Sequence, residues 1–224
     1  MCNELEYPDV KRSVRTMNIG IIGAGNIGTT VAKLFAQAGH QVAISNTKGP
    51  ESLKQLVAEI GPNAKAATVE DAIKFGEVIL LAIRWTQRNS LPNAQLFENK
   101  IVIDAINAYA TDGDGNFQPV PLGDTTSSEE ILKLMPGARL VKAFNTMYFE
   151  TLQTGGSSIP EKRLVLFIAG DDSEAKEVVA HLIEDIGFAA VDTGFLHEGG
   201  RRQQPGSPIY NAPMTVDQVK EITA

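Results

Sequence analysis

Apolar runs alternate with amphipathic stretches along most of the chain, beginning at residue 18. Residues 18–22 form an apolar run of strand type, and residues 41–44 form the next one. Between them Val31, Leu34 and Ala38 recur at helical spacing, which predicts an amphipathic helix. Further strand-like runs follow at residues 64–67, 77–83, 100–104, 139–144, 164–170 and 188–191. Strands that alternate with helices in this way predict an α/β fold of Rossmann type, with a doubly wound and mostly parallel sheet.

The same pattern divides the chain into three parts. Residues 1–16 are polar and are interpreted as a flexible N-terminal tail, whereas residues 17–146 carry the strands and helices of a dinucleotide-binding domain. Residues 147–224 are predicted to form a small C-terminal α/β extension that borders the substrate cleft. Clusters of glycine, proline and polar residues predict long loops over 111–123 and 199–208.

A glycine turn joins the first predicted strand to the first helix, with Gly23, Gly25 and Gly28 spaced as G-x-G-x-x-G. In a dinucleotide-binding unit the first glycine makes the tight turn and the second lets the backbone approach a pyrophosphate. The third lets the helix pack against the strand, and the helix N-terminus directs free N–H groups at the phosphates. Three glycines can also merely shape such a turn, but the strand, helix and second strand around them favour dinucleotide binding.

The end of the second strand bears on which dinucleotide binds. NAD-binding folds place an acidic residue there for the ribose hydroxyls, and its carboxylate would repel a 2′-phosphate. This chain instead has three neutral hydrogen-bonding side chains and one cation, namely Ser45, Asn46, Thr47 and Lys48. A lysine with neighbouring donors suits a 2′-phosphate, so the sequence favours NADP over NAD. An ordinary polar turn with a solvated lysine is the alternative.

Three later strand ends are expected to line the nicotinamide pocket, because ligands of open α/β sheets bind outside the carboxyl ends of the strands. They cover residues 82–85, 104–108 and 143–146. In the first segment, which begins with Ala82, an apolar residue would pack on the nicotinamide ring and Trp85 would border the hydride acceptor. Simple packing is the alternative for this only tryptophan.

Polar side chains near these strand ends are further candidates. Asn107 and Asn145 are candidates to bind the carboxamide or the ribose, although asparagines also occur at strand-end turns for backbone reasons. Arg84 and His197 are candidates for the acceptor pocket, and the other two histidines are expected away from the cleft. We identify no certain catalytic residue and no metal site.

Composition and charge exclude several classes of partner. The chain has 224 residues and a formal net charge of −7, which argues against nucleic acid and anionic membranes as partners. No apolar run approaches the length of a membrane span, and the first residues lack the apolar core of a signal peptide. A single cysteine excludes an intrachain disulfide framework. These observations predict a cytoplasmic protein with a small-molecule partner.

Four separated motifs carry a family resemblance: the GAGNIG turn, NTKGPESL from Asn46, LVKAFNT from Leu140 and QPGSPIYN from Gln204. Together they resemble the NADPH-dependent coenzyme F-420 reductases, which transfer hydride between NADP and a deazaflavin. Related domains of membrane ferric reductases pass hydride from NADPH to a flavin. The family usually has Ser-Arg where this chain has Thr47-Lys48, which keeps the charge but loses the planar arginine fork.

The resemblance also implies a homodimer and a set of cofactor contacts. Those contacts come from Ala24, Gly25, Asn26, Ile27, Asn46, Thr47, Lys48, Ile83 and Ala143. Hydride transfer fits a chain without a compelling catalytic triad, because it needs only two rings held face to face.

The leading hypothesis is an NADP-dependent oxidoreductase that transfers hydride between NADPH and a deazaflavin (coenzyme F-420) or a flavin. A non-catalytic NADPH-binding regulator is the alternative. An enzyme needs an open acceptor face beside residues 83–85, whereas a regulator need only hold the adenosine half of the cofactor. An imine reductase of the pyrroline-carboxylate type shares the N-terminal unit, but the length and the strand-containing last third argue against its long helical dimerisation domain.

Overall fold

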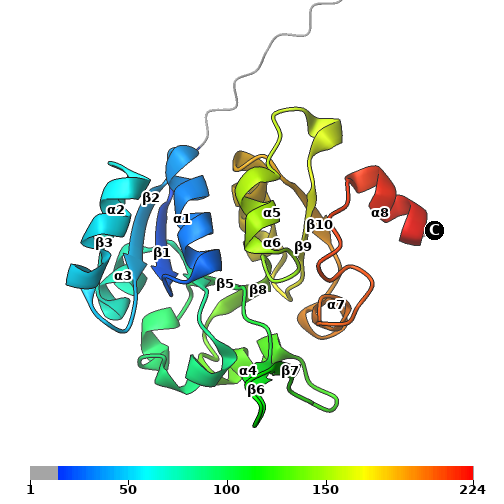
Figure 1. Cartoon of the computed structure of the whole chain (residues 1–224), viewed down its shortest axis with the longest axis horizontal. Helices are drawn as coiled ribbons and strands as arrows, with labels where there is room; N and C mark the ends of the chain where they lie inside the picture. The colour runs from blue at the N-terminus through cyan, green and yellow to red at the C-terminus, as the bar shows by residue number, and fades with distance from the viewer. Residues whose placement is uncertain (1–14, 224) are drawn as a thin grey trace, which may run out of the picture.

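The computed structural model describes residues 15–223, so positions 1–14 of the expected N-terminal tail lie outside the described part. The centre of the fold is a six-stranded parallel sheet in the order β3-β2-β1-β4-β5-β8 (Figure 1). These strands cover Asn18–Ile22 (β1), Gln41–Ser45 (β2), Ala64–Ala66 (β3), Val78–Leu81 (β4), Ile101–Asp104 (β5) and Arg139–Lys142 (β8). The order reverses between β1 and β4, which confirms the prediction of a doubly wound Rossmann-type sheet.

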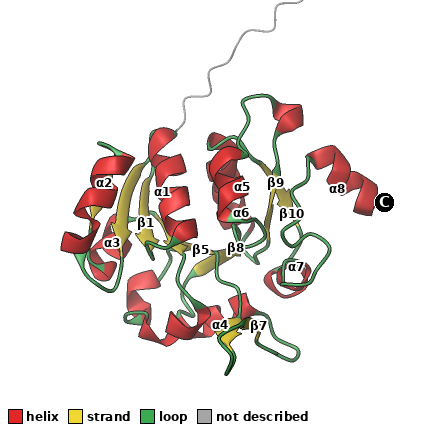
Figure 2. Ribbon diagram, viewed as in Figure 1, coloured by secondary structure: helices red, strands yellow, loops and turns green. Residues whose placement is uncertain are grey.

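Helices flank the sheet and the smaller C-terminal lobe (Figure 2). They cover Asn26–Gln37 (α1), Lys54–Ile60 (α2), Val69–Phe75 (α3), Ser127–Leu134 (α4), Phe149–Thr154 (α5), Ser173–Asp185 (α6), Leu196–Arg202 (α7) and Val216–Thr223 (α8). Short 3-10 helices cover Pro50–Leu53 (η1), Trp85–Ser90 (η2), Ala94–Phe97 (η3) and Pro160–Lys162 (η4). No helix within residues 15–223 is both long enough and apolar enough to cross a bilayer.

Two apolar clusters hold these helices against the sheet. Helices α1 and α6 share the first cluster with Ile19 and Ile21 of β1, whereas α3 and α4 share the second with Ile22. Because successive side chains of a strand point to opposite faces, the two clusters lie on opposite sides of the sheet. The fold therefore leaves the carboxyl ends of the strands as the edge at which loops can form a site.

The C-terminal lobe is built on two parallel strands, Val165–Ile168 (β9) and Ala189–Asp192 (β10). An antiparallel bridge between Lys142 and Ala169 joins this pair to the end of β8. Helix α6 begins at an Asp172 cap, whose carboxylate accepts a hydrogen bond from Ala175 N at 2.9 Å. The first apolar cluster contains residues of both α1 and α6, so the lobe and the nucleotide-binding unit share one core.

The structure differs from the sequence prediction at four places. A β-hairpin, Tyr109–Thr111 (β6) with Phe117–Pro119 (β7), overlaps the segment 111–123 that was expected to be a loop, and α7 takes in the start of the second expected loop. In α7 a Cβ on Gly199 would lie 2.7 Å from the Ala169 Cβ, so the glycine there serves close packing. Strands β4 and β8 each end two residues before the predicted limit. After β8 the chain turns at Phe144, whose φ of 63° is not a strand conformation.

Candidate functional site

The glycine turn after β1 packs against the end of β4. Gly23 has a φ of 111°, and a Cβ there would lie 2.3 Å from the Ala82 carbonyl oxygen. A Cβ on Gly28 would lie 1.9 Å from the Gly23 carbonyl oxygen. Both positions therefore require glycine for the turn and for helix–strand packing. A Cβ on Gly25 would meet no heavy atom within 4 Å, so Gly25 instead faces open space.

The N-terminus of α1 opens onto this same space. Gly25 is its N-cap residue and offers no side-chain cap to the first N–H groups of the helix. Gly25 and Asn26 are exposed, and Ala24 and Ile27 are half-buried around them. Uncapped helix N–H groups and the positive end of the helix dipole suit an anion such as a pyrophosphate.

The loop after β2 is ordered by its own side chains. The Asn46 Oδ1 atom accepts a hydrogen bond from Lys48 N at 2.9 Å, and Asn46 Nδ2 donates to Ser52 Oγ at 3.0 Å. Thr47 and Lys48 are exposed, so their side chains are free to meet a 2′-phosphate. Ser45 is fully buried and donates its hydroxyl to the Ile21 carbonyl at 2.9 Å. The Ser45 hydroxyl therefore pairs with strand β1, and a contact of this residue with the cofactor stays a prediction.

A pocket of about 500 Å³ lies at the carboxyl ends of β4 and β5. Its lining combines four predicted site residues with five that were not predicted as site residues, although Tyr210 and Asn211 belong to the QPGSPIYN motif. The lining residues are Ile83, Arg84, Trp85, Asn107, Tyr109, Phe117, Tyr148, Tyr210 and Asn211. Trp85 is 5% exposed, and the Arg88 guanidinium stacks on its ring at 4.1 Å from the centroid, so packing is also part of its role.

The hairpin, the C-terminal loop and the N-cap position of α5, which is Tyr148, supply the residues that were missed. Tyr109 and Phe117 come from the β6–β7 hairpin, and Tyr210 comes from the segment after α7. Phe117 and Tyr148 are 66% and 61% exposed. Two large aromatic side chains exposed beside one pocket are a signal that only the folded chain can show, because they are far apart in sequence.

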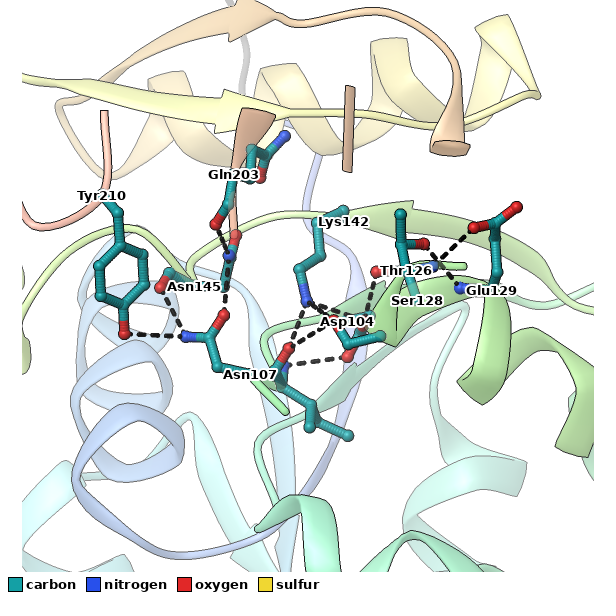
Figure 3. A network of polar contacts seen from close by, with 11 residues as sticks. Asp104, Asn107, Thr126, Ser128, Glu129, Lys142, Asn145, Gln203 and Tyr210 are labelled. Carbon is teal, nitrogen blue, oxygen red and sulfur yellow. Dashed lines mark hydrogen bonds and ion pairs between the residues drawn. The ribbon is translucent and has the colours of Figure 1, made fainter. Parts of the chain in front are cut away.

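A network of amides holds Asn107 in place (Figure 3). Its Nδ2 atom donates to the Asn145 carbonyl at 2.8 Å, and Asn145 Nδ2 donates to Asn107 Oδ1 at 3.1 Å. Asn145 also donates to the Gln203 carbonyl at 2.8 Å and is only 5% exposed, while Ala143 is fully buried. Asn145 and Ala143 therefore support the site from behind, whereas Asn107 lines the pocket itself.

The family described as NADP oxidoreductase coenzyme F420-dependent matches residues 18–108, from β1 to the loop after β5. A hypothetical protein from Sinorhizobium meliloti is 35% identical in sequence, with 89% of this chain and 96% of that chain covered and a TM-score of 0.80. Over residues 18–108 the chain belongs to this F-420-dependent NADP oxidoreductase family.

Two further relatives of this oxidoreductase bear on its activity. A candidate F-420-dependent NADP reductase from Arthrobacter sp. FB24 is 25% identical, covers 80% of this chain and 86% of its own, and has a TM-score of 0.70. Metalloreductase STEAP3 of Rattus norvegicus is 28% identical over 80% of this chain, which spans only 34% of that relative's length. These matches place residues 18–108 in a family of NADP-dependent oxidoreductases.

His197 lies outside the aromatic pocket of this oxidoreductase. Its Nδ1 atom is 3.0 Å from Glu129 Oε1, and both residues line a different pocket, between α4 and α7. Burial raises the pKa of Glu129, but hydrogen bonds from His197 and Thr126 outweigh it and lower that pKa. The expected place of His197 in the acceptor pocket does not hold, because α7 turns the side chain toward the capping carboxylate of α4.

A buried ion pair stands beside the Asn107 network (Figure 3). Lys142 Nζ lies 3.1 Å from Asp104 Oδ2 and also donates to Ser127 Oγ and to the Ile106 carbonyl. Asp104 further accepts hydrogen bonds from Ser128 Oγ at 2.6 Å and from Ile106 N at 2.9 Å. Burial lowers the pKa of Lys142, and the Asp104 carboxylate opposes that shift. The pair ties the ends of β5 and β8 together just before the segment that carries Asn107.

Proposed function

We propose that this NADP-dependent oxidoreductase transfers hydride from NADPH to a planar conjugated acceptor, a deazaflavin of the coenzyme F-420 type or a flavin. The observation that carries the proposal is the pocket lined by aromatic side chains at the ends of β4 and β5. Tyrosine and phenylalanine rings pack well against a flat conjugated ring. The pocket also adjoins the glycine turn, because Gly23 packs directly against Ala82 at the end of β4.

The proposed cofactor position follows the strand ends. The pyrophosphate would lie over Gly25 and the N-terminus of α1, where the backbone leaves room for it. The adenosine 2′-phosphate would meet Thr47 and Lys48, while Asn46 shapes their loop. The nicotinamide ring would then reach Ile83 and the mouth of the aromatic pocket.

Hydride transfer of this kind needs no particular catalytic side chain. Hydride moves from the nicotinamide to the acceptor when the two reacting carbon or nitrogen atoms are held about 3–3.5 Å apart. Binding and orientation therefore supply the catalysis, and the cofactor supplies the reactivity. The Arthrobacter relative, by its description, supports a deazaflavin acceptor. The STEAP3 relative, described as a metalloreductase, supports electron transfer beyond the NADP site.

The deciding experiment is NADPH oxidation by purified protein, followed at the nicotinamide absorbance with coenzyme F-420, FMN, FAD and riboflavin in turn. Turnover with one acceptor at catalytic protein concentration would establish the reductase. Tight NADPH binding without turnover on any acceptor would contradict the proposal and favour a regulator that senses NADPH.

Cofactor choice is tested by Lys48→Glu. If Lys48 meets the 2′-phosphate, this change should weaken NADPH binding about 10-fold to 100-fold and leave NADH binding nearly unchanged. Lys162→Glu is the matched control, because Lys162 is an exposed lysine of the C-terminal lobe. Equal losses for both cofactors would remove Lys48 from that role. A homodimer and a cytoplasmic location stay predictions, for light scattering and cell fractionation to test.

A further inference from the structure

The lining of the aromatic pocket includes a single charged side chain, that of Arg84. It follows the end of β4 and shares the lining with eight uncharged residues. Neither aspartate nor glutamate is among them, so nothing in the lining neutralises the guanidinium. The chain as a whole has a formal net charge of −7. The pocket is therefore a locally positive place on a negatively charged protein, and such a place attracts an anion.

The backbone of Arg84 is held in place, whereas its guanidinium is left without a partner. Arg84 N donates to Gln87 Oε1 at 3.4 Å, and the Arg84 carbonyl accepts from Gln87 N at 2.9 Å. Within residues 15–223 no hydrogen bond or ion pair uses the Arg84 guanidinium. Its neighbour Arg88 differs, because that side chain donates to the Trp85 carbonyl at 3.0 Å and stacks on the Trp85 ring. The five N–H groups of Arg84 are therefore available to a ligand.

The anionic groups of NADPH have other partners in the proposed site. The pyrophosphate would lie over Gly25 and the uncapped N-terminus of α1, and the 2′-phosphate would meet Thr47 and Lys48. These positions are the glycine turn and the loop after β2, whereas Arg84 lies among the aromatic side chains at the ends of β4 and β5. Arg84 is therefore placed to meet the second substrate and not the phosphates of the cofactor.

We propose that Arg84 binds a phosphate on the side chain of the hydride acceptor, while the aromatic residues of the same pocket hold the acceptor ring. This inference rests on the proposed function and narrows the acceptor to flavins or deazaflavins that carry a phosphate. FMN, FAD and coenzyme F-420 carry one, whereas riboflavin has the ring of FMN without it. A guanidinium matches a phosphate with two parallel hydrogen bonds, so Arg84 would act as a specificity-determining residue.

The surroundings of Arg84 set the size of the effect. The side chain is exposed at the pocket, so water and salt screen its attraction for a phosphate. The fork of two hydrogen bonds adds to what a single exposed ion pair supplies. We therefore expect a moderate preference for the phosphorylated acceptor, and one that weakens as the ionic strength rises. The aromatic contacts with the ring carry no charge, and they should not depend on salt in this way.

The test measures the dissociation constants of FMN and riboflavin by calorimetry, with the protein saturated with NADP⁺ so that no reduction occurs. Wild-type protein should bind FMN about 5-fold to 20-fold more tightly than riboflavin, between the effect of an exposed ion pair and that of a hydrogen bond to a charged group. Arg84→Gln should remove most of this preference. Arg84→Lys should keep part of it, because the charge remains but the fork is lost. If only deazaflavins bind, coenzyme F-420 and the same ring system without its phosphate tail form the pair.

Arg202→Gln is the matched control, because Arg202 is an exposed arginine outside the lining of this pocket. It loses the same charge and should retain the preference for FMN, and thermal melting should show all variants folded.

Three outcomes would overturn the inference. Equal wild-type affinities for the two members of the pair, or a preference that Arg84→Gln leaves intact, would do so and leave the proposed function standing. An Arg84→Gln variant that weakens NADPH binding, measured without acceptor, more than FMN binding would assign Arg84 to the cofactor instead. A wild-type protein that neither binds nor reduces any flavin or deazaflavin would overturn the proposed function as well.

Discussion

Replacing Lys142 by methionine should destabilise the folded protein by about 3–5 kcal/mol, because it leaves the Asp104 carboxylate buried without its cation. The two side chains are 1% and 0% exposed, so water cannot take the place of the lost ion pair. The change also removes the donors to Ser127 Oγ, at 3.2 Å, and to the Ile106 carbonyl. Asp104 retains its hydrogen bonds from Ser128 Oγ and Ile106 N, which keeps the loss within that range.

The assay is urea unfolding, followed by circular dichroism and by the fluorescence of Trp85, the single tryptophan. Lys176→Met is the matched control: it breaks an ion pair of 2.7 Å but leaves the Asp192 carboxylate 47% exposed. We expect a loss of about 0–1 kcal/mol there.

A double variant separates charge burial from simple loss of packing. Asp104→Leu combined with Lys142→Met removes both charges, and it should recover part of the stability that Lys142→Met alone loses. A Lys142→Met loss no larger than that of Lys176→Met would refute the reasoning. So would a double variant less stable than Lys142→Met.

Three further predictions concern the α6 cap and the glycine turn. Asp172→Asn keeps a capping side chain but loses the hydrogen-bonded pair with Arg139, which lowers the pKa of Asp172 to about 2. This folded-state pKa lies below the unfolded value of about 3.9, so the pair stabilises the protein above about pH 4 and its contribution is lost as the pH falls toward 2. Because the side chain is partly exposed, the variant should lose only about 1 kcal/mol of unfolding free energy at neutral pH, and little at about pH 2. Urea unfolding at both pH values measures this, and an equal loss at both would contradict the prediction. Gly25→Val should abolish binding of NADPH and NADH in calorimetry while the circular dichroism spectrum stays unchanged, because a branched side chain would fill the pyrophosphate space; retained affinity would rule out the assigned position. Gly28→Ala should instead lower the melting temperature, because its Cβ would lie 1.9 Å from the Gly23 carbonyl oxygen, and an unchanged melting temperature would show that the helix can shift at no cost.

The sequence predicted those parts of the fold that depend on residues close together in the chain. The strand–turn–helix around Gly23 and Gly28 depends on residues within a few positions of one another, and β1, α1 and β2 lie where the pattern places them. Ser45 shows the limit of such reasoning. Its position at the strand end was right, but whether its hydroxyl faces the cofactor or strand β1 depends on a hydrogen bond across the sheet.

The aromatic pocket could not be derived in the same way. Tyr109 and Tyr210 are separated by about a hundred positions, and no spacing rule brings them together. The hairpin that carries Tyr109 is short, and the Asp112 side chain, which accepts from Asn116 N at 2.9 Å, holds its turn. In sequence that segment has the composition of a loop. The predicted place of His197 was wrong for a related reason, because its partner Glu129 belongs to another helix.

Because α1 and α6 share one apolar core, we expect the nucleotide-binding unit and the C-terminal lobe to unfold together as one cooperative unit. Any ligand that binds only the folded chain stabilises all of it, by about 2.7 kcal/mol at a concentration 100 times the dissociation constant. Cofactor binding at the glycine turn should therefore slow amide hydrogen exchange in β9 and β10 wherever exchange requires global unfolding. Occupancy of the cofactor site would in this way set the lifetime of strands that lie outside the glycine turn.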